Sequence, residues 1–401
     1  MPPRKKHKSA PRVSGPDRIG DLPDCILQHV LSFLPAQAAV QTCVLARRWR
    51  DLWRSTRCLR IVNLHDEIQY IRKFVDHLLI LRERTDLDTV EIKFSCEYWE
   101  EDVAYVNLWI RFAVMYNVRV LTLHVSHRYL HLHDLPLVSR HLTTLDLYGL
   151  ALEEKVLGFA SCPALENLKM SLCEIHAARI SSRSLKHLSI TDCRSDLDDC
   201  RVRVSTPGLV SLELLDFLWR TPFFENMALL ESARVSISEY CHDDVSWNYY
   251  DSGVLDGANN NAGSDCVLLG GLSSARHLEL RSDGTKYIFR RDVKHCPIFS
   301  KLKTLILNEY WCEAPDFSPL ACILKKSPVL EKLTLQLFSK GPNHKVEMKG
   351  CYSSTEKSSA ISEHLNTVEI KCNVVDEKIL EVMKFLKAFN IRKLTTLYIL
   401  I

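Results

Sequence analysis

Apolar residues recur along most of the chain in one spacing, apolar-x-x-apolar-x-apolar. The last positions of each unit alternate between apolar and polar residues, which is typical of a β-strand with one buried face. Five of the ten start-to-start spacings lie between 20 and 24 residues, a period typical of stacked repeats. The pattern therefore predicts a solenoid of parallel strands. Its eleven units are LDTVEI from Leu87, VRVLTL from Val118, LTTLDL from Leu142, LENLKM from Leu165, LKHLSI from Leu185, LVSLEL from Leu209, LESARV from Leu230, ARHLEL from Ala275, LKTLIL from Leu302, LEKLTL from Leu330 and LNTVEI from Leu365.

The ninth residue of each unit tests this register, and seven of the eleven are small polar residues or cysteines. In these features the chain resembles the leucine-rich-repeat family, which places Asn or Cys there to bond the turn leaving the strand. The resemblance implies an α/β fold, with parallel strands on the concave face and helices and loops on the convex face. It also gives Cys173 and Cys193 a structural role. The long spacings predict loop insertions at 239–266, which is acidic, and at 339–362. The ninth residues are Ser95, Ser126, Leu150, Cys173, Cys193, Phe217, Ser238, Asp283, Tyr310, Phe338 and Asn373.

Residues 17–60 carry a different, helical pattern. Pro23 suits a first helical turn, Pro35 stops the helix that follows, and apolar residues recur between them at helical spacing. Two further helices are expected after Pro35. Trp49 and Trp53 are four apart, so they point to the same side of the last helix, as core residues do. Three short helices bury too little area to be stable alone, so we expect this module to have a partner.

The same segment resembles the F-box of plant proteins, because LPDCILQHVLSFLP and AVQTCVLARRWRDLW carry the family's residues in order and spacing. Cys43 and Ala46 depart from it, since serines are usual at both positions. If Ala46 caps the third helix, the missing acceptor costs about 1 kcal/mol. The resemblance implies a three-helix module that docks on a Skp-type adaptor and so joins a cullin-based ubiquitin ligase. The resemblance implies that the adaptor contacts are Leu22, Pro23, Ile26, Leu27, Val30, Leu31, Leu34 and Pro35. It also implies that the residues that build the fold of the module and its rim are Val44, Trp49, Leu52 and Trp53.

The carboxyl-terminal segment, residues 363–401, predicts a strand, a turn and an amphipathic helix. With LNTVEI as its strand, it resembles the FBD segment that closes many plant F-box repeat proteins. We therefore expect four parts: a disordered basic tail at 1–16, an F-box at 17–60, a leucine-rich-repeat region at 61–362 that includes the two insertions, and the FBD-like segment.

Composition and charge narrow the classes of function. A chain of 401 residues with 46% hydrophobic and 25% charged residues is typical of a soluble globular protein. The net charge is +3, and the first 16 residues hold five bases and no acid, so subtracting these five leaves −2 for the remainder. A body of that charge disfavours nucleic-acid binding. The run Lys5, Lys6 and Lys8 predicts nuclear import, and no apolar segment is long enough for a membrane span, so we expect a nuclear or cytoplasmic protein.

Metal binding and catalysis have little support in the sequence. The fifteen cysteines contain no CxxC pair, which excludes a zinc finger or ribbon and predicts free thiols. His124, His127, His131 and His133 with Asp134 leave a metal-dependent activity open as an alternative, but their spacing fits a strand or loop better than a helix. No GxSxG, P-loop, GxGxxG or HExxH motif occurs. We therefore expect no catalytic residue, no metal and no cofactor.

The leading functional hypothesis joins the two resemblances. The F-box would hold a Skp-type adaptor and, through it, a cullin, while the concave face of the repeats would hold a protein target for ubiquitination. The chain itself would be a non-catalytic substrate receptor. The alternative is a leucine-rich-repeat scaffold that binds a partner without ubiquitin transfer. The candidate target contacts are Asp146, Lys169, His187, Glu213, Arg234, His277, Glu279 and Lys332.

Overall fold

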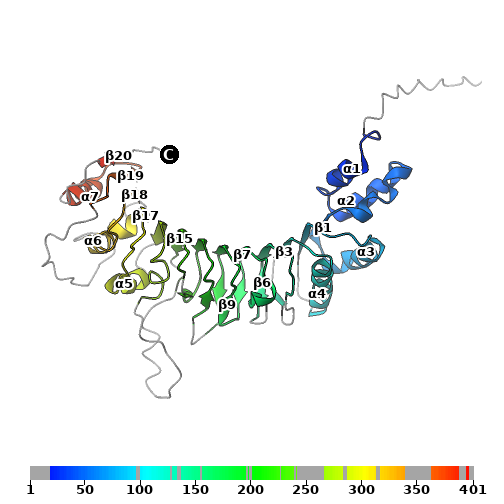
Figure 1. The fold of residues 1–401 in the computed structure, drawn as a ribbon, viewed down its shortest axis with the longest axis horizontal. Coiled ribbons are helices and arrows are strands. Elements are labelled where there is room, and N and C mark those ends of the chain that lie inside the picture. Colours follow the sequence, from blue (N-terminus) through cyan, green and yellow to red (C-terminus); the bar gives the residue numbers. More distant parts are fainter. Residues whose placement is uncertain are drawn as a thin grey trace, which may run out of the picture.

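The chain forms an elongated arc, with a helical module at the amino-terminal end and helix α7 (Glu377–Lys387) towards the other end (Figure 1). The predicted tail at 1–16 and the insertion at 339–362 lie outside the described residues, as does 239–266 except for Cys241 and Cys266. The expectations for these segments stay predictions. The computed structural model describes residues 19–95, 100–126, 129–132, 137–153, 156–195, 197, 201–225, 227–238, 241, 266–282, 287–312, 317–338, 363–387 and 394–396.

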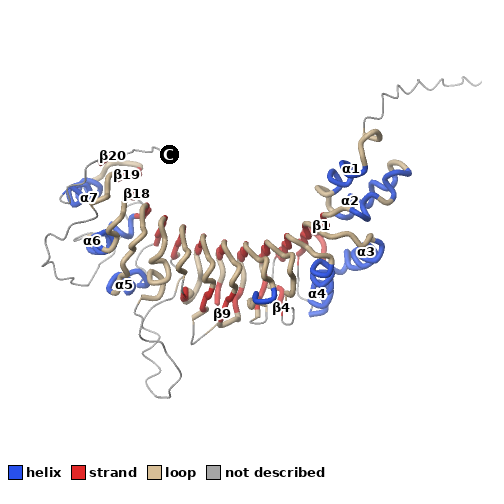
Figure 2. The backbone as a smooth tube through the Cα atoms, viewed as in Figure 1, coloured by secondary structure: helices blue, strands red, loops and turns tan. Residues whose placement is uncertain are grey.

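A 13-stranded parallel sheet lines the concave side of the arc (Figure 2). Each of the eleven predicted units begins two residues before one of these strands, so the predicted register and the leucine-rich-repeat fold are confirmed. In spatial order the strands are β1 (Cys58–Glu67), β2 (Thr89–Ser95), β3 (Val120–Ser126), β5 (Thr144–Tyr148), β7 (Asn167–Ser171), β10 (His187–Thr191), β13 (Ser211–Leu215), β15 (Ser232–Ile237), β16 (His277–Ser282), β17 (Thr304–Asn308), β18 (Lys332–Leu337), β19 (Thr367–Cys372) and β20 (Leu394–Thr396).

The two outermost strands, β1 and β20, were not predicted. In β1 the apolar pair Leu59 and Ile61 is buried, but Thr56 stands three residues ahead of it, where the eleven predicted units have an apolar residue. Helix α3 (Ile68–Leu81) follows β1 and connects it to β2, so the solenoid begins inside the segment assigned to the helical module.

The convex side differs from the expectation of helices and loops in its middle part. There, two smaller parallel sheets follow the concave strands, because units of 20 to 24 residues leave no room for a helix after a strand and two turns. The α-helices occur where the spacing is longer, whereas the three-residue 3-10 turn η4 (Phe159–Ser161) lies in a unit of 23 residues. The smaller sheets consist of β4 (Leu130–Leu132), β6 (Leu150–Leu152), β8 (Glu174–Ile175) and β11 (Arg194–Ser195), and of β9 (Arg179–Ser181), β12 (Arg203–Ser205) and β14 (Phe223–Glu225). The helical segments are α4 (Glu100–Met115), η4 (Phe159–Ser161), α5 (Tyr287–Lys294), η6 (Glu309–Cys312), α6 (Ser318–Lys325) and α7.

The turns that leave the central concave strands repeat one backbone feature. The residue before the ninth position has a positive φ at Gly149 (70°), Leu172 (49°), Asp192 (51°) and Asp216 (51°). At Gly149 a side chain would collide with the carbonyl oxygen of Val125, so only glycine fits there.

Cys173 and Cys193 follow two of these turns and are buried. The Cys173 backbone N–H donates to Cys193 Sγ at 3.4 Å, and the Cys193 thiol donates to the Thr191 carbonyl at 3.4 Å. Their predicted structural role is confirmed, and the described cysteines are free thiols.

The sheet continues across the longest gap between units. β15 and β16 pair directly, with Ser232 opposite His277, so the segment between them is an insertion in one repeat and leaves the stack unbroken. One apolar core extends from Leu27 in the helical module to Leu386 in α7. Among the described residues, no helix is long and apolar enough to cross a membrane.

Candidate functional site: two interaction surfaces

The amino-terminal module contains two short α-helices and three 3-10 turns. α1 (Asp24–Leu31) begins directly after Pro23 and α2 (Ala36–Gln41) directly after Pro35, as predicted. The turns η1 (Thr42–Val44), η2 (Arg47–Arg50) and η3 (Leu52–Ser55) stand where one further helical stretch was expected.

The inner face of α1 holds the module together. Leu27 and Leu31 are buried, as are Leu52 and Trp53 from η3. The Trp53 indole N–H donates to the Arg50 carbonyl at 2.9 Å, which satisfies its one polar atom. Leu52 and Trp53 therefore lie in the core of the module. Leu27 and Leu31 were predicted to contact an adaptor. Both side chains are buried in the core of this structure, and the adaptor contact stays a prediction.

The outer face of α1 is apolar and open to solvent. Ile26 and Val30 are four residues apart and share one side of the helix, and Phe33 follows in the turn after it, where its N–H donates to the Val30 carbonyl at 3.2 Å. The three side chains are 44%, 48% and 61% exposed. Exposed apolar side chains gathered on one face are typical of an interaction surface. Phe33 was not among the predicted adaptor contacts, although the sequence indicates it as apolar surface beside the main stripe of the first helix.

The other predicted contacts of this module are divided between surface and interior. Pro23 and Pro35 are exposed, while Leu22, Leu34 and Trp49 are half-buried. Val44 was predicted to belong to the fold and its rim, and at 83% exposure it contributes to the surface alone. Val44 is the last residue of the short turn η1.

Arg48 joins the two ends of the module, a role that the sequence did not indicate. Its guanidinium lies 2.6 Å from the Asp24 carboxylate and donates to the carbonyls of Gly20 and Leu22. The residues that precede α1 are thereby fixed to η2. Ala46 is the N-cap of η2 and, as expected from the missing serine, gives no side-chain hydrogen bond.

A buried arginine ties the module to the solenoid. Arg82 follows α3, and its guanidinium donates to Thr56 Oγ1 at 3.2 Å, to the Trp53 carbonyl at 3.5 Å and to the Thr56 carbonyl. Burial lowers the pKa of Arg82 to about 10, so the side chain keeps its charge at neutral pH. From the other side, Arg54 Nε donates to the Leu81 carbonyl at 2.7 Å.

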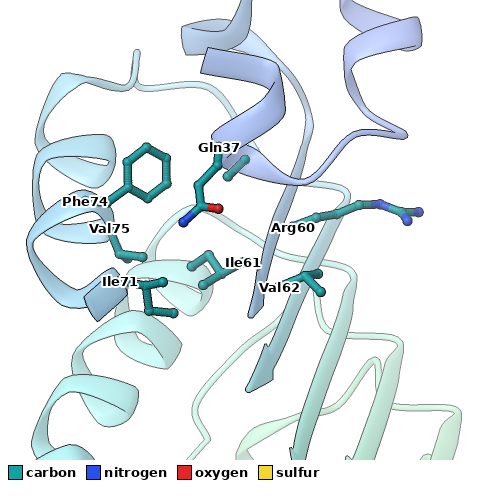
Figure 3. Close-up of a pocket in the computed structure, with 8 residues that line it drawn as sticks. Gln37, Arg60, Ile61, Val62, Ile71, Phe74 and Val75 are labelled. Atoms are coloured by element: carbon teal, nitrogen blue, oxygen red, sulfur yellow. The ribbon is translucent and has the colours of Figure 1, made fainter. Parts of the chain in front are cut away.

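Apolar packing completes this junction. Gln37 of α2 lines a small pocket together with Ile61 of β1 and with Phe74 and Val75 of α3 (Figure 3). The small pocket at this place is lined from both parts of the chain, so the module is packed on the first repeat as well as joined to it. Its lining residues are Ala36, Gln37, Arg60, Ile61, Val62, Ile71, Phe74 and Val75.

The concave face of the large sheet is the second surface. All eight predicted target contacts lie on it, at outward positions of β5, β7, β10, β13, β15, β16 and β18. Those towards the carboxyl-terminal end are already engaged within the chain. Arg234 lies 3.5 Å from both Glu213 and Glu279. Their charges are thus largely neutralised before any target arrives.

The remaining predicted contacts on this flank have partners too. Lys332 lies 2.7 Å from Glu369, and this hydrogen bond lowers the pKa of the Glu369 carboxyl. His277 Nδ1 is 2.7 Å from Thr304 Oγ1. At the amino-terminal flank, Glu91 similarly pairs with Arg60 at 3.4 Å.

Between these flanks lies a central patch, defined as His124, Asp146, Tyr148, Lys169 and His187. Asp146 and Lys169 stand opposite each other on β5 and β7, yet within the described part of the chain neither makes an ion pair. The rings of His124 and Tyr148 stack at 3.8 Å. Burial, with a nearby lysine, lowers the pKa of His124 below its usual value, so the ring is neutral at pH 7. The patch therefore offers one anion, one cation and a neutral aromatic platform.

Of the predicted histidine cluster, His124 and His131 are described, and they lie on different sheets. His124 faces the concave side on β3, whereas His131 lies on β4 in the smaller sheet. His127, His133 and Asp134 lie outside the described residues. The nuclear-import run Lys5, Lys6 and Lys8 also lies outside them and stays a prediction.

Comparison with known proteins agrees with this arrangement. An F-box domain matches residues 19–61. The chain is 31% identical over 407 residues to the F-box/FBD/LRR-repeat protein At5g22660 of Arabidopsis thaliana, covering 91% of this chain and 85% of that protein. It is 30% identical over 400 residues to the meiotic F-box protein MOF of Oryza sativa subsp. japonica, covering 88% and 80%.

A third relative, the F-box/LRR-repeat protein At3g58930 of Arabidopsis thaliana, is 26% identical over 376 residues, covering 80% of this chain and 76% of that protein. These similarities extend from the helical module through the solenoid. With an F-box at its amino-terminal end and a leucine-rich solenoid behind it, the chain belongs to the F-box/FBD/LRR-repeat proteins of plants.

Proposed function

We propose that this chain is the substrate-recognition subunit of a Skp/cullin/F-box ubiquitin ligase. Its F-box docks a Skp-type adaptor, which brings a cullin, and its repeats hold a protein target. The outer face of α1 carries the proposal, because Ile26, Val30 and Phe33 are exposed together on a module whose interior is already closed. In this role the chain is not catalytic. It supplies two binding surfaces, while ubiquitin transfer belongs to other subunits.

The junction supports a role in positioning. Arg82 and the packing around Gln37 hold the F-box on the first repeat, so a target on the concave face stays at a set place relative to the adaptor. Holding two reactants in one assembly raises their effective concentration, which is how a receptor without chemistry of its own accelerates transfer.

The target site is the central patch. A charged side chain that is already paired within the chain gains little from a partner, whereas Asp146 and Lys169 are ready to pair with charges on a target. The stacked rings of His124 and Tyr148 add a flat apolar surface. This combination fits a polypeptide that carries both signs of charge beside an aromatic or apolar residue.

Adaptor binding by the full-length protein tests the proposal. Burying a Val or Phe side chain completely contributes about 1.5–3 kcal/mol. Val30 and Phe33 are 48% and 61% exposed, so roughly half of that remains to be gained from each on docking. Val30→Ala with Phe33→Ala should therefore weaken binding of a plant Skp-type adaptor by about 2–3 kcal/mol, roughly 30- to 100-fold, in titration calorimetry.

The matched control is Ile80→Ala, which removes a 79% exposed apolar side chain from α3 and should leave adaptor affinity unchanged. Circular dichroism verifies that all variants fold. A charge at Leu31 is unsuitable as a test, because that side chain is buried and the variant would unfold. If the folded wild type does not bind the adaptor, the ligase role is wrong and a repeat scaffold without ubiquitin transfer takes its place.

A further inference from the structure

Three repeats bring together three side chains of types that can bind metal ions, on the smaller, four-stranded sheet. His131 lies in β4, Glu153 directly follows β6, and His176 directly follows β8. Their potential ligand atoms all lie within 4.8 Å of one another. These residues are 22 and 23 positions apart in the sequence, so no local motif marks them, and only the stacking of the repeats brings them into one place.

The strand register explains why they meet. Side chains two residues apart point to the same face of a strand, so Glu153 shares its face with Ala151, and His176 shares its face with Glu174. His131 stands opposite Ala151, which in turn stands opposite Glu174. Because Ala151 has only a methyl group, the imidazoles of His131 and His176 come together above it, with their ring centroids 5.9 Å apart and nearly parallel.

We propose that His131, Glu153 and His176 form a binding site for a zinc-type divalent cation. Two imidazoles and one carboxylate are a ligand set that zinc uses when water takes its fourth position. Zinc with bonds of 2.0–2.1 Å brings its ligand atoms to roughly 3.3 Å of one another, so contraction by about 1.5 Å at most completes the site, within the reach of side-chain rotation. Hard cations such as Mg²⁺ and Ca²⁺ prefer oxygen ligands alone and fit this set poorly.

The surroundings suit such a site. Glu174 is buried and its Oε2 lies 3.7 Å from His176 Nε2, near enough to accept a hydrogen bond from the imidazole after a small rotation. Carboxylates in this outer position orient metal-binding histidines. Arg194 pairs with Glu174 on the side of β11 and neutralises its charge. The three side chains are only half-buried, so a cation reaches them from solvent.

The position suggests what the cation does. The strands β4, β6 and β8 belong to the same three repeats as β3, β5 and β7. The concave face of β3, β5 and β7 carries most of the central patch. A cation bound to all three would fasten these repeats to one another behind the patch. This inference does not depend on the ligase role, because it concerns only the solenoid.

Zinc content and stability of the purified full-length protein test the site. Chelator-treated wild type, the double variant His131→Gln with His176→Gln, and the control His141→Gln, which removes an exposed histidine nearby, are each dialysed against zinc with magnesium in excess. The wild type and the control should each retain one equivalent more zinc than the double variant. Zinc should raise the thermal midpoint of these two proteins alone, since a ligand that binds the folded state stabilises it.

Cobalt substitution separates this site from the thiols. Nitrogen and oxygen ligands give no thiolate charge-transfer band. The difference between the absorption spectra of the cobalt-loaded wild type and the cobalt-loaded double variant should therefore contain no such band. Equal zinc content and equal thermal shifts in wild type and double variant would overturn the proposal, as would a lost signal of thiolate type. Glu153→Gln, which keeps the shape of a half-buried side chain, gives the same test if the double variant does not fold, and there zinc affinity should fall at least about tenfold.

Discussion

Replacing Arg82 by methionine tests the junction between the F-box and the repeats. The change keeps an unbranched side chain that packs, and it removes the guanidinium. The Arg82 guanidinium makes two close hydrogen bonds, one to Thr56 Oγ1 at 3.2 Å and one to the Thr56 carbonyl. Hydrogen bonds to charged groups contribute about 1.5–3 kcal/mol each, so the pair contributes roughly 3–6 kcal/mol.

Desolvation opposes this contribution. Burial lowers the pKa of Arg82 to about 10, and at about 1.36 kcal/mol per unit the fall from the ordinary value of a guanidinium corresponds to roughly 3 kcal/mol. The variant regains that amount, so its net loss of stability is about 0–3 kcal/mol, with a central value of about 1.5 kcal/mol. Because the folded-state pKa lies below the unfolded value, the cost of burying the cation is fully present below about pH 10 and disappears only as pH rises through both values. The loss should therefore be constant from pH 6 to pH 9.

Urea unfolding of full-length protein, with hydrogen exchange of residues 47–56, measures the effect. Arg84→Met is the matched control, since it removes an exposed arginine two residues away. We expect Arg82→Met to unfold at lower urea than the control and to exchange faster at residues 47–56. Equal stability and equal exchange in the two variants would refute the reasoning that the guanidinium holds the junction.

Further expectations follow from single sites. Ala46→Ser should raise the unfolding free energy by about 1 kcal/mol in urea titration, because it supplies the missing N-cap acceptor of η2; an unchanged midpoint would contradict this. The pKa of His124, measured by NMR, should lie below 6.5 and should move towards 6.5 in Tyr148→Ala. Because its folded-state pKa lies below the unfolded value, the contribution of His124 to stability should fall as pH drops through about 6.5. A wild-type pKa at or above 6.5 would be inconsistent with the burial of the ring. Asp146→Lys with Lys169→Glu should reduce the amount of protein that this chain retains from plant extract, quantified by mass spectrometry. The same charge exchange at the paired Lys332 and Glu369 should not reduce it. Equal retention by the two variants would show that the target does not bind at the central patch.

The strands of the solenoid were the most predictable part of the fold. An apolar residue three positions ahead of an alternating apolar pair marked each of eleven strands, because burial of one face imposes that spacing wherever repeats stack. β1 lacks the leading apolar residue, so its two buried residues Leu59 and Ile61 were too short a signal. The convex strands contain only two or three residues each, and no periodicity is measurable over such lengths.

The sites were less predictable than the fold. The spacing in α1 identified an apolar helix but could not say which half of the stripe faces inward, since that depends on η3 packing against Leu27 and Leu31. Likewise, alternation placed Asp146 and Arg234 on the concave face, but only the register of neighbouring strands shows that Arg234 is paired and Asp146 is not. His131, Glu153 and His176 meet through stacking alone.

Hydrogen exchange of full-length protein with and without a plant Skp-type adaptor tests the central claim that adaptor and target use separate surfaces. The account predicts slower exchange on adaptor binding within residues 19–55, strongest around α1, and unchanged exchange in β3, β5, β7 and β10. Slower exchange across those concave strands, or no change within residues 19–55, would contradict it.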